Sequence, residues 1–263
     1  ALPISADGTF RKTIKKFVIN GSSPSGSGWT GDHLFPLIKD QDCLRVLALL
    51  ATLIRNGELD DTCRSYLLGN PLYALPKPAG GVRPIVPAEP FYKMATATAI
   101  ETNIDEVTNL LGSFQLGVGG KGGSEAAAWL LRALAQNHAL LALDFANAFN
   151  SLDRAAMLRE LFQCPELATM WRMVHWAYKE PTALWILDRD HGIIETILSG
   201  RGCRQGDPFA PILFAIAVKR IYEHMMGVGG AETRGVAILD DVTVAGPPEN
   251  LLRCAEDLLE GGR

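Results

Sequence analysis

Apolar residues recur three or four positions apart over several long stretches of the chain, the spacing that places them on one face of an α-helix. Local signals mark some of the boundaries. Asn56-Gly57 ends the first long stretch, Ser124 is a suitable cap, and Asp207 followed by Pro208 is a typical helix start. The pattern predicts helices over residues 33–56, 91–111, 124–137, 154–162, 165–178, 208–225 and 249–261.

Shorter apolar runs bounded by Gly, Pro and Asp predict strands. Three hairpins are expected, over residues 72–87, 182–198 and 236–245, and the first is rich in Pro and therefore edge-like. The run "ALLAL" at 139–143 has no polar alternation, which predicts a strand buried on both faces. Helices and strands follow one another irregularly, so the fold class is α+β, without the regular βαβ alternation of a parallel sheet.

The composition is that of an ordinary globular protein large enough for a core and two subdomains. Of the 263 residues, 48% are hydrophobic and 21% are charged, and no apolar run is long enough to predict a membrane span. The net charge of −4 argues against nucleic-acid binding, although a local basic face is compatible with it. Five scattered cysteines predict thiols in a reducing, intracellular compartment.

Two adjacent aspartates, Asp240 and Asp241, interrupt the apolar run "VAILDDVTVAG" near the C-terminal end. One interpretation is a tight acidic turn in a plain hairpin, because Asp favours turns. The second interpretation is a site that also includes Asp144, which directly follows the apolar strand 139–143. If the strands are neighbours in one sheet, three carboxylates converge, and such a set persists only if it is protonated or if a cation neutralises it. Hard oxygen ligands of this kind select Mg²⁺ or Mn²⁺.

Five segments, in order along residues 24–246, resemble the reverse transcriptase family of RNA-directed DNA polymerases. "LDFANAF" is similar to its first palm motif, with Asp144 and an aromatic five residues later. "GCRQGDPFAPILF" resembles the motif in which Gln-Gly enters a helix, and "ILDD" resembles the Tyr-x-Asp-Asp hairpin. Upstream, "LPKPAGGVRPI" resembles the fingers strands, and "SPSGSGWTGDHL" resembles the N-terminal segment of non-LTR retrotransposon polymerases.

The resemblance implies the fingers and palm of a right-hand polymerase, with an antiparallel palm sheet packed on helices. The expected division is an N-terminal extension and loop at 1–35, fingers with part of the palm at 36–138, and the palm with its catalytic aspartates at 139–263. The chain starts with Ala and stops soon after the acidic hairpin, so we expect a piece of a longer polyprotein whose thumb and other domains are missing here.

The resemblance also implies roles for the acidic and basic residues. Asp144, Asp240 and Asp241 would be catalytic and would hold two Mg²⁺ ions, or Mn²⁺, with Asp241 either a direct ligand or a residue that tunes the site from a second position. Lys77 and Arg83 would clamp the triphosphate, the alternative being a solvated charge pair. The partners implied are an RNA template, a DNA primer and dNTPs, with no membrane, in the nucleus if the host is a eukaryote.

The remaining motif residues would contact the substrate or shape its site. Phe149 would lie beneath the sugar and exclude a 2′-hydroxyl, or be a core aromatic, and the two roles are compatible. Gln205 and Gly206 would let the backbone approach the nascent base pair, or form a plain helix-start turn. Arg204 and Lys121 are candidates for contact with the phosphate backbone, with structural roles equally open.

One residue departs from the family pattern. Ile238 stands where the family has Tyr or Phe, which leaves room for a catalytically decayed or repurposed reverse-transcriptase-like domain that binds RNA. An RNA-dependent RNA polymerase ranks lower, since those enzymes have Gly-Asp-Asp and a polar residue where Phe149 stands. Trp29 is expected to pack on the protein and not to stack on a base.

Overall fold

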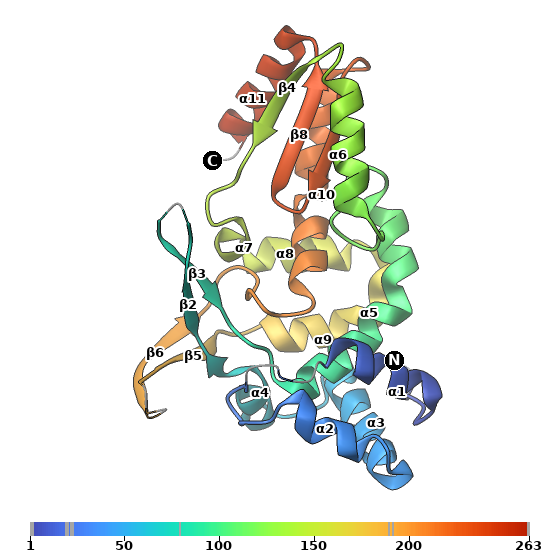
Figure 1. Cartoon of the computed structure of the whole chain (residues 1–263), viewed down its shortest axis with the longest axis vertical. Coiled ribbons are helices and arrows are strands. Elements are labelled where there is room, and N and C mark those ends of the chain that lie inside the picture. Colours follow the sequence, from blue (N-terminus) through green and yellow to red (C-terminus); the bar gives the residue numbers. More distant parts are fainter. Residues whose placement is uncertain are drawn as a thin grey trace. The chain divides into compact units, whose positions relative to one another are not determined.

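The computed structural model describes residues 3–18, 21, 24–78, 80–188, 190 and 192–261. The chain forms two compact units, each built from two separate stretches of sequence (Figure 1). The first unit contains Ala1–Asn103 and Asn150–Ala210, and the second contains Ile104–Phe149 and Pro211–Arg263. The division into an extension, fingers and palm remains a prediction about function.

The first unit is mostly helical, with two small sheets. Helix α9 packs against α3, α4 and α8, and strands β1, β5 and β6 form one sheet while β2 and β3 form a hairpin. The elements are α1 (Gly8–Phe17), α2 (Gly31–Leu37), α3 (Gln41–Asn56), α4 (Asp61–Leu68), β1 (Asn70–Pro71), β2 (Tyr73–Pro76), β3 (Val82–Ile85), the first part of α5 (Pro90–Leu111), α8 (Arg154–Phe162), η1 (Pro165–Leu167), α9 (Ala168–Tyr178), β5 (Thr182–Leu187) and β6 (Ile193–Ser199).

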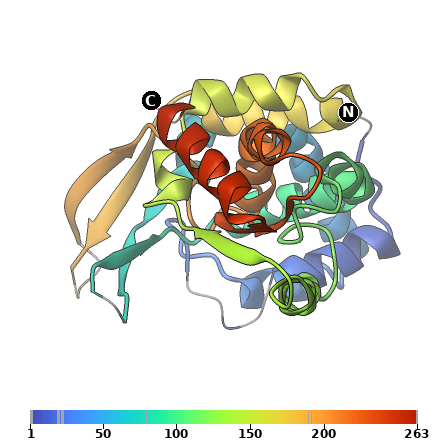
Figure 2. The same ribbon diagram turned by 90° about the horizontal axis from the view of Figure 1, so that it is seen from above.

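The second unit is a three-stranded antiparallel sheet between helices. The strand order is β4-β8-β7, and Figure 2 shows α6 on one side of this sheet and α10 and α11 on the other. Its elements are the end of α5, α6 (Gly123–Leu134), β4 (Ala139–Leu143), the start of α7 (Ala148–Ser151), α10 (Ala210–Gly229), β7 (Arg234–Ile238), β8 (Asp241–Gly246) and α11 (Pro248–Gly261). The predicted α+β class is confirmed.

Several predicted helices have different starts. The helix predicted over residues 33–56 is two helices, because the Asp40 carboxylate accepts from the N–H groups of Asp42 and Cys43 and starts a new one. Its predicted end is correct, since Gly57 takes a left-handed φ of 64°. Ser124 does not cap α6; Gly122 does, in the left-handed region.

Helix α4 was not predicted, and a buried arginine holds it in place. The Arg64 guanidinium donates to the carbonyl oxygens of Trp176, in the last turn of α9, and Glu180, just after that helix, at 2.6 Å each. This contact joins residues more than 110 positions apart in sequence, so the local pattern of residues 58–68 does not contain it.

The loop predicted over residues 20–32 lies partly outside the described residues. From Pro24 onward it is built onto Glu89, whose carboxylate accepts from the hydroxyls of Ser25 and Ser27 just before α5. The Trp29 ring packs 5.1 Å from that of Phe91, centroid to centroid, so the predicted packing is observed, while the absence of base stacking stays a prediction.

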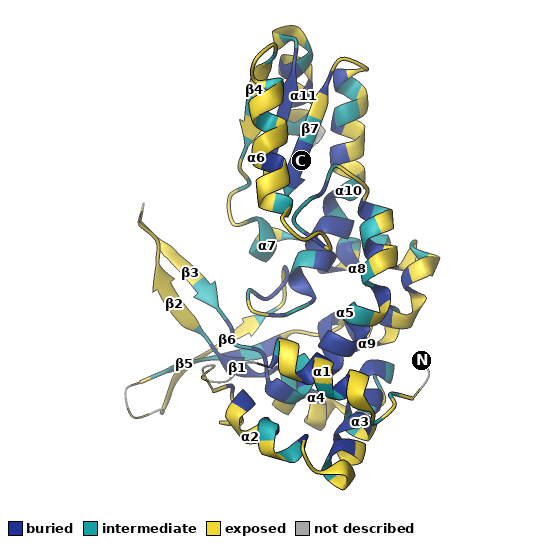
Figure 3. Cartoon of the chain, turned by 45° about the vertical axis from the view of Figure 1, so that its right-hand side comes forward, coloured by how far each residue is buried: buried dark blue, intermediate teal, exposed yellow. Residues whose placement is uncertain are grey.

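Strand β4 is not buried on both faces as its sequence predicts. It is an edge strand of the second unit's sheet, and three of its five residues are exposed, including Leu140 at 45% (Figure 3). The run "ALLAL" lacks polar residues, but the sheet has no further strand among the described residues on that side. Apolar composition alone therefore overestimated its burial.

Candidate active site

The acidic turn lies at the tip of the hairpin formed by β7 and β8. Ile238 pairs with Asp241, so Leu239 and Asp240 are the two residues of the turn. In the neighbouring pair of strands, Leu143 lies opposite Val242, and Asp144 follows directly. The register therefore brings Asp144, Asp240 and Asp241 to the same end of one sheet.

The chemistry of this set suits a hard divalent cation. All three side chains offer carboxylate oxygens, the ligands that Mg²⁺ prefers. Among the described residues, however, no group of three or more His, Cys, Asp or Glu side chains is close enough to hold a metal ion. The shared sheet end is observed, while convergence of the three carboxylates at metal-bridging distance remains a prediction.

Tyr222 on α10 lies beside the acidic turn. Its hydroxyl donates to the carbonyl oxygen of Leu239 at 3.2 Å, and its ring packs against Phe114 and Phe145. Burial raises the pKa of Tyr222, and the negative charges of Asp240 and Asp241 raise it further. The phenol therefore stays protonated and can donate at any physiological pH.

Gln115 is a second residue at this turn that sequence reasoning missed. Its side chain oxygen accepts from the backbone N–H of Leu239 at 2.8 Å. The sequence pattern assigns no element to residues 112–116, and no motif marks a glutamine there. The contact spans 124 positions of sequence, so only the folded chain reveals it.

Phe149 is the second residue of the short helix α7, five residues after Asp144. It is half-buried, and its ring stacks on Phe214 of α10 with centroids 4.6 Å apart and planes 14° from parallel. Between the two motif residues, Asn147 takes a left-handed φ of 51°, which Asn tolerates better than most residues. The packing role of Phe149 is observed, and its contact with a sugar remains a prediction.

Lys77 and Arg83 are on the β2–β3 hairpin of the first unit, and both are exposed. Figure 3 shows that much of this hairpin is exposed. Arg83 pairs with Leu75, while the N–H of Lys77 donates to the carbonyl of Gly81 at 3.1 Å. Cross-strand partners share a face, as do residues two apart, so the two cations project from the same face. Neither makes an ion pair within the described part of the chain.

Gln205 and Gly206 form a turn docked on the chain after β3. The N–H of Val86 donates to the carbonyl of Gln205 at 2.7 Å. Gly206 has a φ of 113°, and a Cβ there would lie 2.2 Å from the Val86 carbonyl oxygen. Only glycine fits this position, so the Gln-Gly pair is more than a plain helix start.

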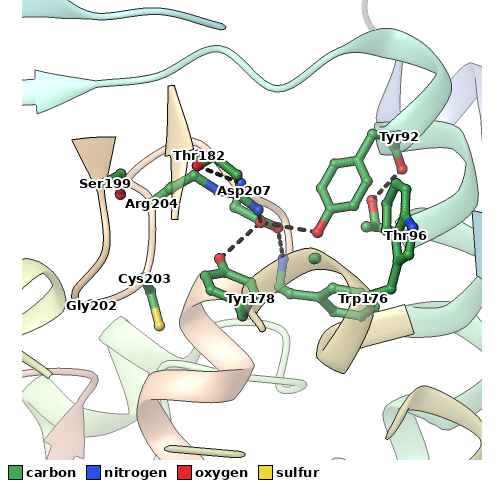
Figure 4. A network of polar contacts seen from close by, with 12 residues as sticks. Tyr92, Thr96, Trp176, Tyr178, Thr182, Ser199, Gly202, Cys203, Arg204 and Asp207 are labelled. Carbon is green, nitrogen blue, oxygen red and sulfur yellow. Dashed lines mark hydrogen bonds and ion pairs between the residues drawn. The ribbon is translucent and has the colours of Figure 1, made fainter. Parts of the chain in front are cut away.

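The two residues that flank the Gln205-Gly206 turn, Arg204 and Asp207, belong to a buried ionic network (Figure 4). Arg204 and Asp207 form an ion pair at 3.0 Å, and the hydroxyls of Tyr92 and Tyr178 donate to the same Asp207 oxygen at 3.0 and 2.8 Å. Burial raises the pKa of both tyrosines, and the charge of Asp207 raises it further. Burial alone would lower the pKa of Arg204, but Tyr178 and Asp207 outweigh it and raise the pKa.

This network excludes the phosphate contact considered for Arg204 and gives Asp207 a role beyond starting a helix. Arg204 is 6% exposed and fully engaged, so it does not offer its charge to a phosphate backbone. Asp207 does accept from the N–H of Phe209 at 2.9 Å, as a helix-start residue should, but its carboxylate also anchors the network. Lys121 is exposed, and contact with phosphate remains a prediction for it.

The sequence matches a family model described as reverse transcriptase (RNA-dependent DNA polymerase) over residues 75–261. The chain therefore belongs to the reverse transcriptase family, as its motifs predict. It is 30% identical over 240 residues to the retrotransposable element SLACS 132 kDa protein of Trypanosoma brucei gambiense. That alignment covers 91% of this chain and 20% of the relative, so the chain spans about a fifth of that protein.

Solved structures with the same fold include telomerases. A C-terminally truncated apo telomerase from Candida tropicalis matches 73% of this chain and 46% of its own, with a TM-score of 0.55 at 11% identity. A Candida albicans telomerase, solved with a TWJ fragment of telomeric RNA, matches 77% of this chain and 40% of its own, also at 0.55 and with 9% identity. The similarity confirms the right-hand polymerase fold.

No helix in the described part of the chain is both long and apolar enough to cross a membrane. None of the five cysteines is in a disulfide, as their scattered positions predict.

Proposed function

We propose that this chain is the catalytic domain of a retroelement reverse transcriptase, which adds nucleotides from dNTPs to a primer 3′-hydroxyl on an RNA template. One observation carries the proposal. Within the family-matched segment, the register of β4, β8 and β7 brings Asp144, Asp240 and Asp241 to one sheet end.

Asp144 and Asp240 would hold two Mg²⁺ ions, with Asp241 as a further ligand or a tuning charge. When bound, the ions would neutralise charge on the attacking and leaving oxygens of the transferred phosphoryl group. The rigid hairpin turn supports this role, because carboxylates that bind metal need a fixed backbone.

The other motif residues would act on the nucleotide. Lys77 and Arg83, exposed on one face of their hairpin, would bind the triphosphate oxygens and stabilise charge that grows during transfer. Phe149, held by stacking on Phe214, would present its ring to the sugar and leave no room for a 2′-hydroxyl. The turn at Gln205 and Gly206 would support the base pair through its backbone.

The RNA template is part of the proposal. The family description names RNA as the template for DNA synthesis, and telomerases of this fold have been solved with telomeric RNA. The net charge of −4 means that RNA binding would depend on local basic positions such as Lys121, and on the rest of a longer protein. Localisation in the nucleus of a eukaryotic host belongs to the same proposal.

Primer extension on an RNA template by the full-length protein tests the proposal. We expect Mg²⁺-dependent dNTP incorporation, reduced by about 10³-fold or more in Asp144→Asn and Asp240→Asn, because each removes charge from the transition-state site. Asp105→Asn, at a carboxylate on the second unit's part of α5, is the matched control and should retain activity. Unchanged extension in both motif variants would contradict the proposal.

Ile238 favours one second candidate, an RNA-binding domain that has lost catalysis. It occupies the place where the family has an aromatic side chain, and it pairs directly with Asp241. This candidate predicts RNA binding that is retained in Asp240→Asn, with no extension by the unmodified protein under any Mg²⁺ or Mn²⁺ concentration. Extension that depends on Asp240 would exclude it.

A further inference from the structure

The segment before α6 extends the sheet of the second unit. The N–H of Ala237 donates to the carbonyl of Phe114 at 2.7 Å, and the N–H of Leu116 donates to the carbonyl of Ala237 at 2.8 Å. Gln115 and Ala237 form a parallel bridge, so this segment lies beside β7 at the edge of the sheet. Gln115 is thereby fixed close to the tip of the hairpin.

The Gln115 side chain binds the backbone of the turn. It is 5% exposed, and its oxygen accepts from the N–H groups of both Leu239, at 2.8 Å, and Gly117, at 3.0 Å. Its amide nitrogen lies 3.4 Å from the carbonyl oxygen of Leu239, which also accepts from the Tyr222 hydroxyl. Both polar backbone groups of Leu239 are therefore held by side chains distant in sequence.

Leu239 requires this support because of its backbone conformation. Its φ is 59°, in the left-handed region, at the first central position of a two-residue hairpin turn. Glycine is usual at such a position, since a Cβ makes it unfavourable. Asp240 is the next residue, so any relaxation of Leu239 toward negative φ would move the backbone that carries the Asp240 carboxylate.

The packing leaves the turn little freedom. A Cβ on Gly117 would lie 2.8 Å from the Leu239 nitrogen and 2.9 Å from the Gln115 oxygen, so the backbone of residue 117 closely approaches the turn. Tyr222 covers the turn from α10, with its ring packed on Phe114 and Phe145. Gln115 is the one polar side chain of the described residues that binds both the N–H and the carbonyl side of Leu239.

We propose that Gln115 is a positioning residue of the active site, which holds the strained Leu239-Asp240 turn so that Asp240 is preorganised for its metal. This inference rests on the proposed polymerase function. Side chains that orient metal ligands from outside typically affect metal affinity or activity by about 10–100-fold. A merely structural glutamine would instead change the amount of folded protein and leave the metal requirement alone.

The test is Gln115→Met in the full-length protein, which keeps the length of the side chain and removes its hydrogen bonds. We expect kcat per active site to fall about 10–100-fold and the Mg²⁺ concentration for half-maximal activity to rise, with the KM for dNTP within twofold. The exposed Gln136 of the same unit provides the matched control, Gln136→Met, which should behave as the unmodified protein does.

A double-mutant cycle with Leu239→Gly makes the test specific. Glycine adopts a φ near 59° without strain, so the turn should need less support, and the effect of Gln115→Met should shrink by about tenfold in the glycine background. Tyr222→Phe, which removes the other hydrogen bond to Leu239 and keeps the ring, should raise the Mg²⁺ requirement in the same direction. If Gln115→Met fails to fold, Tyr222→Phe replaces it as the test variant.

Two results would overturn the inference. One is an unchanged kcat and Mg²⁺ requirement per active site in Gln115→Met, or in Tyr222→Phe if that variant replaces it. The other is a loss that is equally large with Leu239 and with glycine at that position. Either leaves the polymerase proposal intact if the unmodified protein extends primers and Asp240→Asn does not. Failure of extension by the unmodified protein would instead contradict the proposed function itself.

Discussion

At the scale of single residues, a side chain at a motif position can also pack inside the protein. Phe149 stacks on Phe214 and is half-buried, yet it sits five residues from Asp144, where the family motif has an aromatic. Arg204 illustrates the opposite case. A cation in a nucleic-acid motif is here fully used inside the protein, because Asp207 and two tyrosines surround it.

Phe149→Val should relax sugar selection in the active protein. The smaller side chain leaves space for a 2′-hydroxyl, and apolar pockets discriminate against an added hydroxyl by about 10²-fold at most. We therefore expect ribonucleotide incorporation relative to dNTP to rise by about tenfold or more, measured as the ratio of kcat/KM values. Phe162→Val, at an exposed aromatic residue of α8 outside the motifs, is the control. An unchanged ratio would leave Phe149 with its packing role alone.

At the scale of elements, turns are fixed by residues that local sequence does not reveal. The Gln205-Gly206 turn depends on Val86 at the end of the β2–β3 hairpin and on the network of Arg204 and Asp207. The acidic turn depends on Gln115 and Tyr222. Beside both two-residue motifs, buried polar side chains from other segments bind: Tyr92 and Tyr178 at the first, and Gln115 and Tyr222 at the second.

Gly206→Ala should destabilise the first unit and lower activity. The new Cβ would lie 2.2 Å from the Val86 carbonyl oxygen, at a φ of 113° that alanine strongly disfavours. We expect a loss of about 2–3 kcal/mol, which corresponds to a Tm lower by roughly 5–10 °C in thermal denaturation. Gly227→Ala is the control, because a Cβ there meets no atom within 4 Å and lies within α10. A Tm unchanged in Gly206→Ala would show that the turn shifts freely.

At the scale of the whole molecule, the chain consists of two units, and each unit contains two stretches that are distant in sequence. The helices α5 and α10 each begin in the first unit and end in the second. The residues proposed to bind the triphosphate belong to the first unit and the three aspartates to the second. Because the three aspartates belong to one unit, metal binding by them should raise the free energy of unfolding of the chain even without primer or template.

Mg²⁺ should stabilise the unmodified protein against unfolding. A ligand at 100 times its Kd adds about 2.7 kcal/mol if it binds only the folded state, which is a Tm increase of roughly 5–10 °C. Removal of the metal with EDTA should reverse the increase, and the double variant Asp144→Asn with Asp240→Asn should not show it. Equal stabilisation of that variant would place the bound metal elsewhere.

Much of the fold follows from local sequence. Pro and Gly around residues 72–87, the Asn56-Gly57 helix end and the apolar runs of the acidic hairpin each act over a few residues, and the structure has the elements they predict. The order of the motifs identified the family correctly. The predicted helix starts were wrong at two places, because Asp40 caps a separate helix and because Gly122, in the left-handed region, precedes α6 in place of Ser124.

Local sequence specifies most of the helices, the three hairpins and the set of candidate carboxylates, since periodicity, turn residues and charge are properties of short segments, but it did not predict α1 or α4. The tertiary structure decided the exposure of β4, the burial of Arg204 and the support of Leu239 by Gln115 and Tyr222. These depend on contacts between segments up to 124 positions apart. Contacts between distant segments determine whether a charged side chain faces solvent or an ion-pair partner. They also determine whether a strained turn is held in place.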